Sequence, residues 1–351
     1  MLAITLADLR FRSRQFLIAV VGAGVVFALA VLMSGMANGF HTEITKTVTS
    51  THADRWVVPK SSSGPFTSIR AIPEDQVGLL RKVAGVKSAG GMVISLQTVD
   101  REAKGLTRVM MLGARPSGPA EFKPAKGSPV HKSGDAVADE RLGLDIGQHF
   151  DLAGKTFTVV GLTTGHTMLG GTPDVFVGLR AAQQVLFGGQ HLVTAVSVQG
   201  RPAKVPAGLK EMSIGAVEKD SLGPMADSVS SVENTRWLMW AVAVIIVAAL
   251  VYVSTLQRTR DFAVLKAVGA SGRDLFMSVA VQAVLVTLGA AGLAASTAWM
   301  FRPLYLVPLV VPGSAYWSLP VIAVVVGLVS SLIAMRRAIT IDPALAFGAG
   351  S

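Results

Sequence analysis

The 351-residue sequence contains no cysteine and has few charged residues. Without cysteine, the chain can have no disulfide framework, no Cys-ligated zinc, no iron–sulfur cluster and no thiol nucleophile. Charged residues make up 15% of the chain and hydrophobic residues 51%, whereas soluble domains carry about 25% charged residues. This shortage of charge argues against a purely soluble enzyme.

The formal net charge is +10, but the charge is not distributed as in a nucleic-acid-binding protein. The cations are dispersed along the chain, and several stand beside long apolar runs rather than on one basic face. A nucleic-acid interface needs a concentrated basic patch or stripe. We therefore expect no nucleic-acid partner.

Four long runs contain no Asp, Glu, Lys or Arg, namely residues 16–36, 237–256, 276–300 and 318–335. Each reaches the roughly 17–25 residues that a helix needs to cross the hydrocarbon core of a membrane. The first run could instead be a signal peptide, because Arg10, Arg12 and Arg14 precede it. It is longer than the apolar region of a signal peptide, which has about 7–15 residues, and we expect a retained helix. The sequence thus predicts an α-helical membrane protein with four transmembrane helices.

Positive charge in the short segments beside these runs predicts the orientation of the chain. Nine cations stand in residues 1–15, 257–275 and 336–351, and only Arg302 stands in the short link 301–317. The nine are Arg10, Arg12, Arg14, Arg258, Arg260, Lys266, Arg273, Arg336 and Arg337. Because positive charge stays in the cytoplasm, we expect both termini and the 257–275 loop inside and residues 37–236 outside. Residues 1–15 have the pattern of an amphipathic helix on the inner membrane surface.

Residues 37–236 change to short alternating segments that predict one large α+β domain between the first two membrane helices. Strands are expected at 54–59, 91–99, 108–112, 155–160, 174–178 and 192–198, and short helices at 73–83 and 179–187. The ends of this domain, residues 37–44 and 228–236, contain no proline. We therefore expect the two adjoining membrane helices to extend into the domain as stalks.

The 257–275 loop carries a segment with the pattern of a short amphipathic helix. Phe262, Leu265 and Lys266 follow the i, i+3, i+4 spacing, and Gly269 is placed to end the helix. Such a helix can dock in a groove of a soluble partner or lie on the lipid headgroups. The amphipathic pattern alone fits both interpretations equally.

Residues 258–271, which read RTRDFAVLKAVGAS, resemble the signature of the FtsX-like permeases of ABC transporters, of the MacB, LolC/LolE and DevC type. Asp261 stands where that signature usually has Glu. Residues 134–147 and 155–161 resemble the MacB-like periplasmic core domain, and residues 341–345 resemble the family's C-terminal tail. The resemblance implies that the loop contacts an ATPase subunit. The contact residues would be Arg258, Arg260, Asp261, Phe262, Leu265, Lys266, Gly269, Ala270 and Ser271.

The resemblance also implies a function. The chain would be a permease in a bacterial cell membrane, with two copies forming a homodimer above two ATPase subunits that bind ATP and Mg²⁺. It would export or extract a lipid, peptide or other amphiphile, in contact with membrane lipid and with an extracytoplasmic adaptor or lipoprotein as a further partner. The alternative is a non-transporting protein that transmits ATP-driven motion to an extracellular cell-wall enzyme. A neighbouring gene for an adaptor would favour the first function, and one for a wall hydrolase the second.

Motifs of catalysis and metal binding are incomplete in this sequence. Residues 154–156, Gly-Lys-Thr, end like a phosphate-binding loop, but His149 replaces the required first glycine, so a hairpin turn is expected. Residues 269–273 resemble a nucleophile elbow, but the last position is Arg273. The six histidines have no metal-ligand spacing. We expect no enzyme activity, no metal and no cofactor in this chain.

Overall fold

The computed structural model describes residues 13–101, 104–116, 118–257, 262, 264, 267–269, 271–301 and 313–338. The chain divides into two compact units. One contains Gly39–Val229 and is called the α+β unit below. The other contains the chain up to Asn38 and most of the chain from Ser230 onward, and is called the helical unit.

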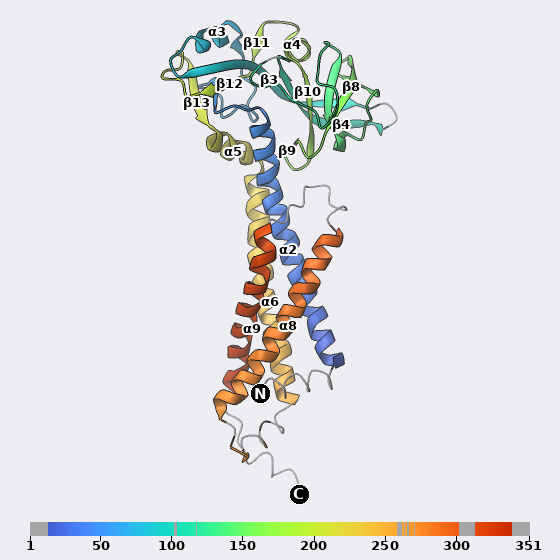
Figure 1. Ribbon diagram of the computed structural model, residues 1–351, viewed down its shortest axis with the longest axis vertical. Helices are drawn as coiled ribbons and strands as arrows, with labels where there is room; N and C mark the ends of the chain where they lie inside the picture. Colours follow the sequence, from blue (N-terminus) through green and yellow to red (C-terminus); the bar gives the residue numbers. More distant parts are fainter. Residues whose placement is uncertain are drawn as a thin grey trace. The chain divides into compact units, whose positions relative to one another are not determined.

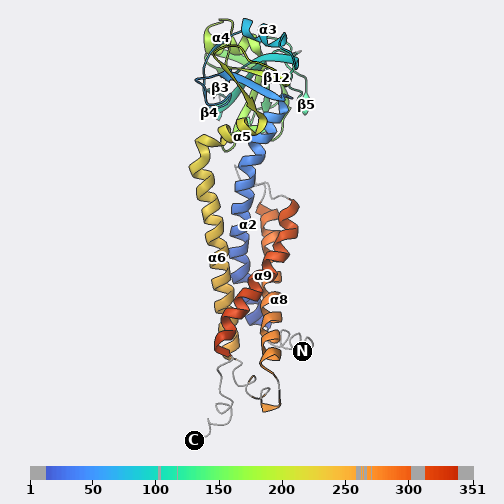
Figure 2. The same ribbon diagram turned by 90° about the vertical axis from the view of Figure 1, so that its left-hand side faces the viewer.

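Long apolar helices build the helical unit (Figures 1 and 2). They are α2 (Ser13–Ser50), α6 (Ala226–Gln257), α8 (Gly272–Phe301) and α9 (Gly313–Ala338). The last part of α2 and the first residues of α6 belong to the α+β unit. Three helical stretches of the described chain are long and apolar enough to cross a membrane: Phe16–Ser50, Ile214–Leu256 and Gly272–Met300. The apolar stretch of α9, Trp317–Leu332, is shorter. The structure thus supports three spans by length and composition, and the fourth stays a prediction.

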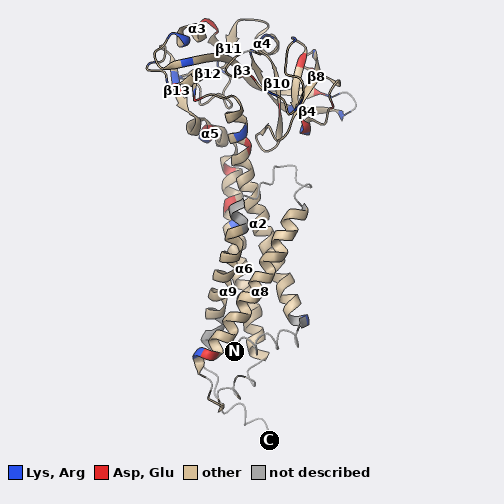
Figure 3. Ribbon diagram, in the orientation of Figure 1, with Lys and Arg blue, Asp and Glu red and all other residues tan. Residues whose placement is uncertain are grey.

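Lys, Arg, Asp and Glu are absent from the middle of these helices, which are tan in the ribbon of Figure 3. The helices pack through alanine, valine and leucine side chains on their inner faces. At Gly24 of α2, an added β-carbon would lie only 2.4 Å from the Leu293 side chain of α8, so glycine allows these helices to approach closely. Gly22 and Gly292 have nothing within 4 Å of such a carbon. Gly24 therefore serves a contact between two helices of this chain, whereas there is free space beside Gly22 and Gly292.

An 11-stranded sheet organises the α+β unit, with the order β13-β1-β12-β3-β4-β10-β6-β8-β5, while β7 pairs with β3 and β8, and β9 pairs with β10. Two pairs, β4 with β10 and β6 with β8, are parallel, and the other pairs are antiparallel. A separate two-stranded sheet joins β2 and β11. The strands are β1 Arg55–Pro59, β2 Ile72–Pro73, β3 Val86–Asp100, β4 Leu106–Ala114, β5 Lys126–Gly127, β6 Asp135–Asp139, β7 His149–Leu152, β8 Lys155–Thr163, β9 Thr167–Met168, β10 Thr172–Gly178, β11 Leu192–Val193, β12 Ala195–Gly200 and β13 Leu209–Ser213.

Helices cover both faces of this sheet (Figures 1 and 2). The helical segments are α3 Asp75–Arg81, η2 Glu140–Leu142, α4 Leu179–Phe187, α5 Ile214–Leu222 and η3 Gly223–Met225. On one face, α3 and α4 bury apolar side chains in a core that includes Val93 and Met111. On the other face, the end of α2 and α5 pack into a second core that includes Ile94 and Met110. Because strand residues alternate between faces, β3 and β4 contribute to both cores.

The predicted α+β fold is confirmed. The expected strands overlap β1, β3, β4, β8 and β10, and the expected helices overlap α3 and α4. The segment 192–198, predicted as one strand, is divided at Thr194 because β11 pairs with β2 whereas β12 pairs with β3. The strands β6, β7 and β13 and the helix α5 were not predicted.

Candidate functional site

The predicted partner-contact loop is described only in part. Arg258, Arg260, Asp261, Leu265, Lys266 and Ala270 lie outside the described residues. Phe262 is 6% exposed and belongs to the apolar core of the helical unit, together with Leu275 and Val279. This side chain therefore anchors the loop on the helices.

Two valines of this loop form an exposed apolar pair. Val264 is 51% exposed and Val268 is 84% exposed. The backbone N–H of Val268 donates to the carbonyl of Val264 at 3.0 Å, so a helical turn places the two side chains on one face. Gly269 follows with φ at 102°, a left-handed conformation that suits glycine at a helix C-terminus.

Ser271 immediately precedes α8 and caps its first turn. Its Oγ donates to Asp274 Oδ2 at 2.6 Å, and the N–H of Asp274 donates back to that Oγ at 3.2 Å. The Ser271 N–H also donates to Asp274 Oδ2 at 3.1 Å. These reciprocal bonds satisfy N–H groups at the start of the helix. A nucleophile elbow needs a strand before the serine, and the described residues of the 257–275 loop contain none.

Polar side chains join helices of the helical unit at two described points. Gln282 Nε2 of α8 donates to Ser254 Oγ of α6 at 2.9 Å. Ser330 Oγ of α9 donates to the Val244 carbonyl of α6 at 3.2 Å. Such bonds hold helices together where no water competes. Both contacts involve α6, which is thereby fixed against two other helices.

The last turns of α2 are held in the α+β unit by a group of polar contacts that we call the α2 clamp, made by Glu43, Lys46 and Thr47 with residues 164–174. Thr47 Oγ1 donates to Asp174 Oδ2 at 2.7 Å. The N–H of Gly171 donates to Glu43 Oε1 at 2.8 Å. Lys46 Nζ donates to the Thr164 carbonyl. The clamp ties a helix to the loop before β9 and to the β9–β10 hairpin.

Burial shifts the pKa of two groups at the clamp, Asp174 and His166. Burial, together with the carboxyl groups of Asp139 and Glu43, raises the pKa of Asp174 well above its ordinary value. Burial and the nearby Lys46 charge lower the pKa of His166 to about 4, so this imidazole is neutral at pH 7. Its Nδ1 lies 2.5 Å from Thr163 Oγ1. Asp174 and His166 thus each favour the neutral form.

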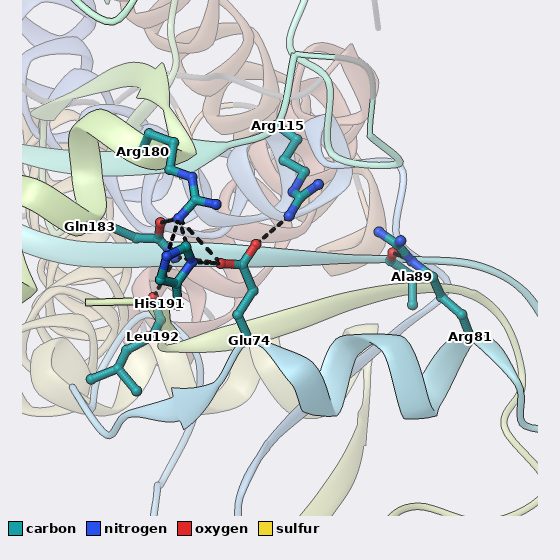
Figure 4. A network of polar contacts seen from close by, with 8 residues as sticks. All are labelled: Glu74, Arg81, Ala89, Arg115, Arg180, Gln183, His191 and Leu192. Atoms are coloured by element: carbon teal, nitrogen blue, oxygen red, sulfur yellow. Dashed lines mark hydrogen bonds and ion pairs between the residues drawn. The ribbon is translucent and has the colours of Figure 1, made fainter. Parts of the chain in front are cut away.

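A second polar network surrounds Glu74 at the start of α3 (Figure 4). Gln183 Nε2 of α4 donates to Glu74 Oε2 at 3.0 Å and to the Leu192 carbonyl at 3.1 Å. Arg115 pairs with the other carboxylate oxygen, Arg180 lies 3.8 Å from Oε2, and His191 lies 3.4 Å from it. Burial raises the pKa of Glu74, but bonds from Arg115 and Gln183 outweigh it and lower the pKa to about 2. The network joins the start of α3 to α4 and to the residue that follows β4.

The sequence motifs considered for other chemistry have structural roles. Lys155 pairs directly with Leu152, so Ala153 and Gly154 form the turn of the β7–β8 hairpin, as predicted. Among the described residues, no group of three or more His, Asp or Glu side chains is placed to hold a metal ion. The α2 clamp had no signal in the sequence, because its partners are separated by 118 to 128 positions.

Comparison with known proteins finds two family models. Residues 237–343 match the FtsX-like permease C-terminal model, and residues 16–212 match the MacB-like periplasmic core domain. An ABC transporter permease of Mycobacterium bovis is 32% identical over 348 residues, which cover 99% of each chain. Another ABC transporter permease, of Mycobacterium tuberculosis, is 34% identical over 351 residues, with the same coverage of 99%.

Solved structures show similarity to the α+β part. The periplasmic region of MacB from Actinobacillus actinomycetemcomitans is 11% identical with a TM-score of 0.37, covering 50% of this chain and 96% of that one. The extracellular domain of the noncanonic ABC-type transporter YknZ from Gram-positive bacteria is 16% identical with a TM-score of 0.34, covering 46% and 99%. The family rests instead on the two models and on relatives that align over 99% of the chain. The chain is an ABC transporter permease of the FtsX-like family, with a MacB-like periplasmic core domain.

Proposed function

We propose that this permease couples ATP hydrolysis by a separate ATPase subunit to movement of its membrane helices and of its α+β unit. The observation that carries the proposal is the continuity of α2, which is one helix from Ser13 to Ser50. Its apolar run supplies a membrane helix, and its last turns are held by the α2 clamp. A helix transmits displacement along its axis because its backbone is fully hydrogen-bonded.

The ATPase contact is proposed to be the 257–275 loop. The exposed pair Val264 and Val268 supplies an apolar face, and anchoring by Phe262 connects that face to the helices. An apolar helical face of this kind can dock in a groove of a soluble protein. A push on the loop would then reach the helix bundle through Phe262.

The membrane arrangement is also part of the proposal. Both termini and the 257–275 loop would lie in the cytoplasm of a bacterial cell, and the α+β unit outside, because nine flanking cations stand on one side of the predicted helices. Two copies of the chain would associate with two ATPase subunits, which bind ATP and Mg²⁺. The substrate would be a lipid, peptide or other amphiphile that is exported or extracted.

Substitution in the loop tests the ATPase contact. With Val268→Asp or Gly269→Pro, the ATPase subunit should no longer co-purify with the permease, because a charge or a broken turn disrupts the apolar face. Ser63→Asp, at an exposed position of the α+β unit, is the control and should leave the yield of ATPase unchanged. If the loop variants insert normally and still retain the ATPase at the wild-type yield, the assignment of this loop is wrong.

A further inference from the structure

Three carboxyl groups gather where the end of α2 meets the sheet. Glu43 is 2% exposed, and Asp139 at the end of β6 and Asp174 in β10 are both fully buried. The other charged or titratable groups that act on them are Lys46 of α2, Arg141 of η2 and His166 of the loop before β9. Because the imidazole of His166 is neutral at pH 7, three acidic groups face two cations.

Asp139 accepts hydrogen bonds at both of its carboxyl oxygens. Its Oδ1 accepts from the N–H of Arg141 at 3.1 Å, and its Oδ2 accepts from the N–H of His166 at 2.8 Å. Both oxygens are therefore satisfied by donors of the backbone. Burial raises the pKa of Asp139, and these bonds offset only part of that effect.

Asp174 and Glu43 are satisfied on one oxygen only. Asp174 Oδ2 accepts from Thr47, and Glu43 Oε1 accepts from Gly171. Asp174 Oδ1, Glu43 Oε2 and Thr167 Oγ1 are buried and make no hydrogen bond of normal geometry among the described residues. Burial raises the pKa of Glu43, and the Gly171 N–H and the Thr167 hydroxyl offset only part of that effect. If both carboxyl groups were ionised, the cluster would hold two unpaired charged acceptors and a single hydroxyl donor. Burying an unpaired charge is far more costly than burying a neutral, bonded group.

We infer that Asp174 holds a proton at neutral pH, and that this bound proton locks the end of α2 onto the β9–β10 hairpin. A protonated Asp174 is neutral, so it adds no negative charge to a buried cluster that already contains Glu43 and Asp139. The Thr47 hydroxyl of α2 can then remain bonded to a buried, uncharged carboxyl group of β10. The groups of the described chain offer no metal site that would do the same.

The consequence is a clamp that weakens as the pH rises. The pKa of Asp174 is raised in the folded chain, so the unfolded chain loses this proton at a lower pH than the clamp does. The stabilisation is therefore complete below the ordinary Asp pKa and is lost as the pH rises through the raised value. Above that value the ratio of open to closed clamp should increase about tenfold per pH unit. A role in coupling rests on the proposed function, whereas the bound proton does not.

The test compares the full-length chain in lipid nanodiscs with Asp174→Asn, without any ATPase. The amide keeps an oxygen that accepts from the Thr47 hydroxyl, and its N–H groups donate hydrogen bonds without a titratable proton. Hydrogen exchange of amides 164–174, corrected for the intrinsic pH effect, should accelerate with rising pH in the wild type and stay constant in Asp174→Asn. Asp151→Asn removes an exposed carboxylate that accepts from Thr156 in the β7–β8 hairpin and is the matched control. It should behave as the wild type does.

Infrared spectroscopy provides a direct readout of the proton. The wild type at pH 7 should show the carbonyl stretching band of a protonated carboxyl group, and Asp174→Asn should lack it. Absence of this band in the wild type would overturn the inference, as would the same pH dependence of exchange in Asp174→Asn. A response that follows added Na⁺ or Ca²⁺ instead of pH would also overturn it, because a cation would then occupy the cluster.

Discussion

Glu74 is the residue on which the contacts of three elements converge in the α+β unit. Its side chain is 12% exposed and contacts Arg115 just after β4, residues of α4 and the segment before β11. The Arg115 and Arg180 side chains are 52% and 59% exposed, so solvent screens their part of the attraction. The buried bond from Gln183 is not screened in this way and should carry more of the stabilisation.

Glu74→Gln should therefore destabilise the chain by about 1–3 kcal/mol at pH 7. The lowered pKa means that the stabilisation is present above the ordinary value of 4.5 and is lost as the pH falls toward about 2. The difference in thermal unfolding temperature between wild type and variant should shrink over that range. Glu140→Gln removes an ion pair whose two side chains are 69% and 39% exposed and should have a smaller effect. Equal effects of the two substitutions would contradict this reading of the network.

Residues of the clamp could not be predicted from the sequence, and the reason is physical. Glu43 and Thr47 lie in a helix, whereas Gly171 and Asp174 lie in a hairpin more than a hundred positions later. Helical or strand periodicity reports contacts between near neighbours and carries no information about such pairs. Phe262 shows the same limit, because its pattern fitted a docking face while the fold buries it in the helical unit.

At the scale of elements, local patterns predicted the regular parts of the fold. Long charge-free runs fell within α2, α6, α8 and α9, and alternation in β3 and β4 matched strands that are buried on both faces. The strands β6, β7 and β13 are only four or five residues long. A segment this short gives few alternations, so the pattern separates it from a loop in some cases, such as the five residues of β1, and not in others.

The helix α2 is part of both compact units. Its helix continues past Asn38, where the two compact units divide. The helix α6 begins at Ala226 and likewise continues across the division at Ser230. A flexible Gly–Ser segment placed at these two points would interrupt both helices, and a coil transmits position poorly.

At the scale of the whole molecule, the distribution of positive charge predicts the orientation of the chain in the membrane. Ser63, Ser128 and Ser271 are exposed positions in a chain without cysteine. Single cysteines at these positions should react with an impermeant thiol reagent in intact cells at 63 and 128 only, and at 271 only after permeabilisation. Reaction of position 271 in intact cells would contradict the orientation.

The most direct test of coupling measures hydrogen exchange of amides 164–174 in the reconstituted permease–ATPase complex, with and without ATP and vanadate. We predict that trapping the ATPase changes exchange in this segment, because α2 carries the displacement to the clamp. A variant with about six Gly–Ser residues inserted after Asn38 and before Ser230 should assemble and hydrolyse ATP but lose this change. Exchange that is the same in both nucleotide states of the wild type, or a change that survives the insertions, would contradict transmission through these helices.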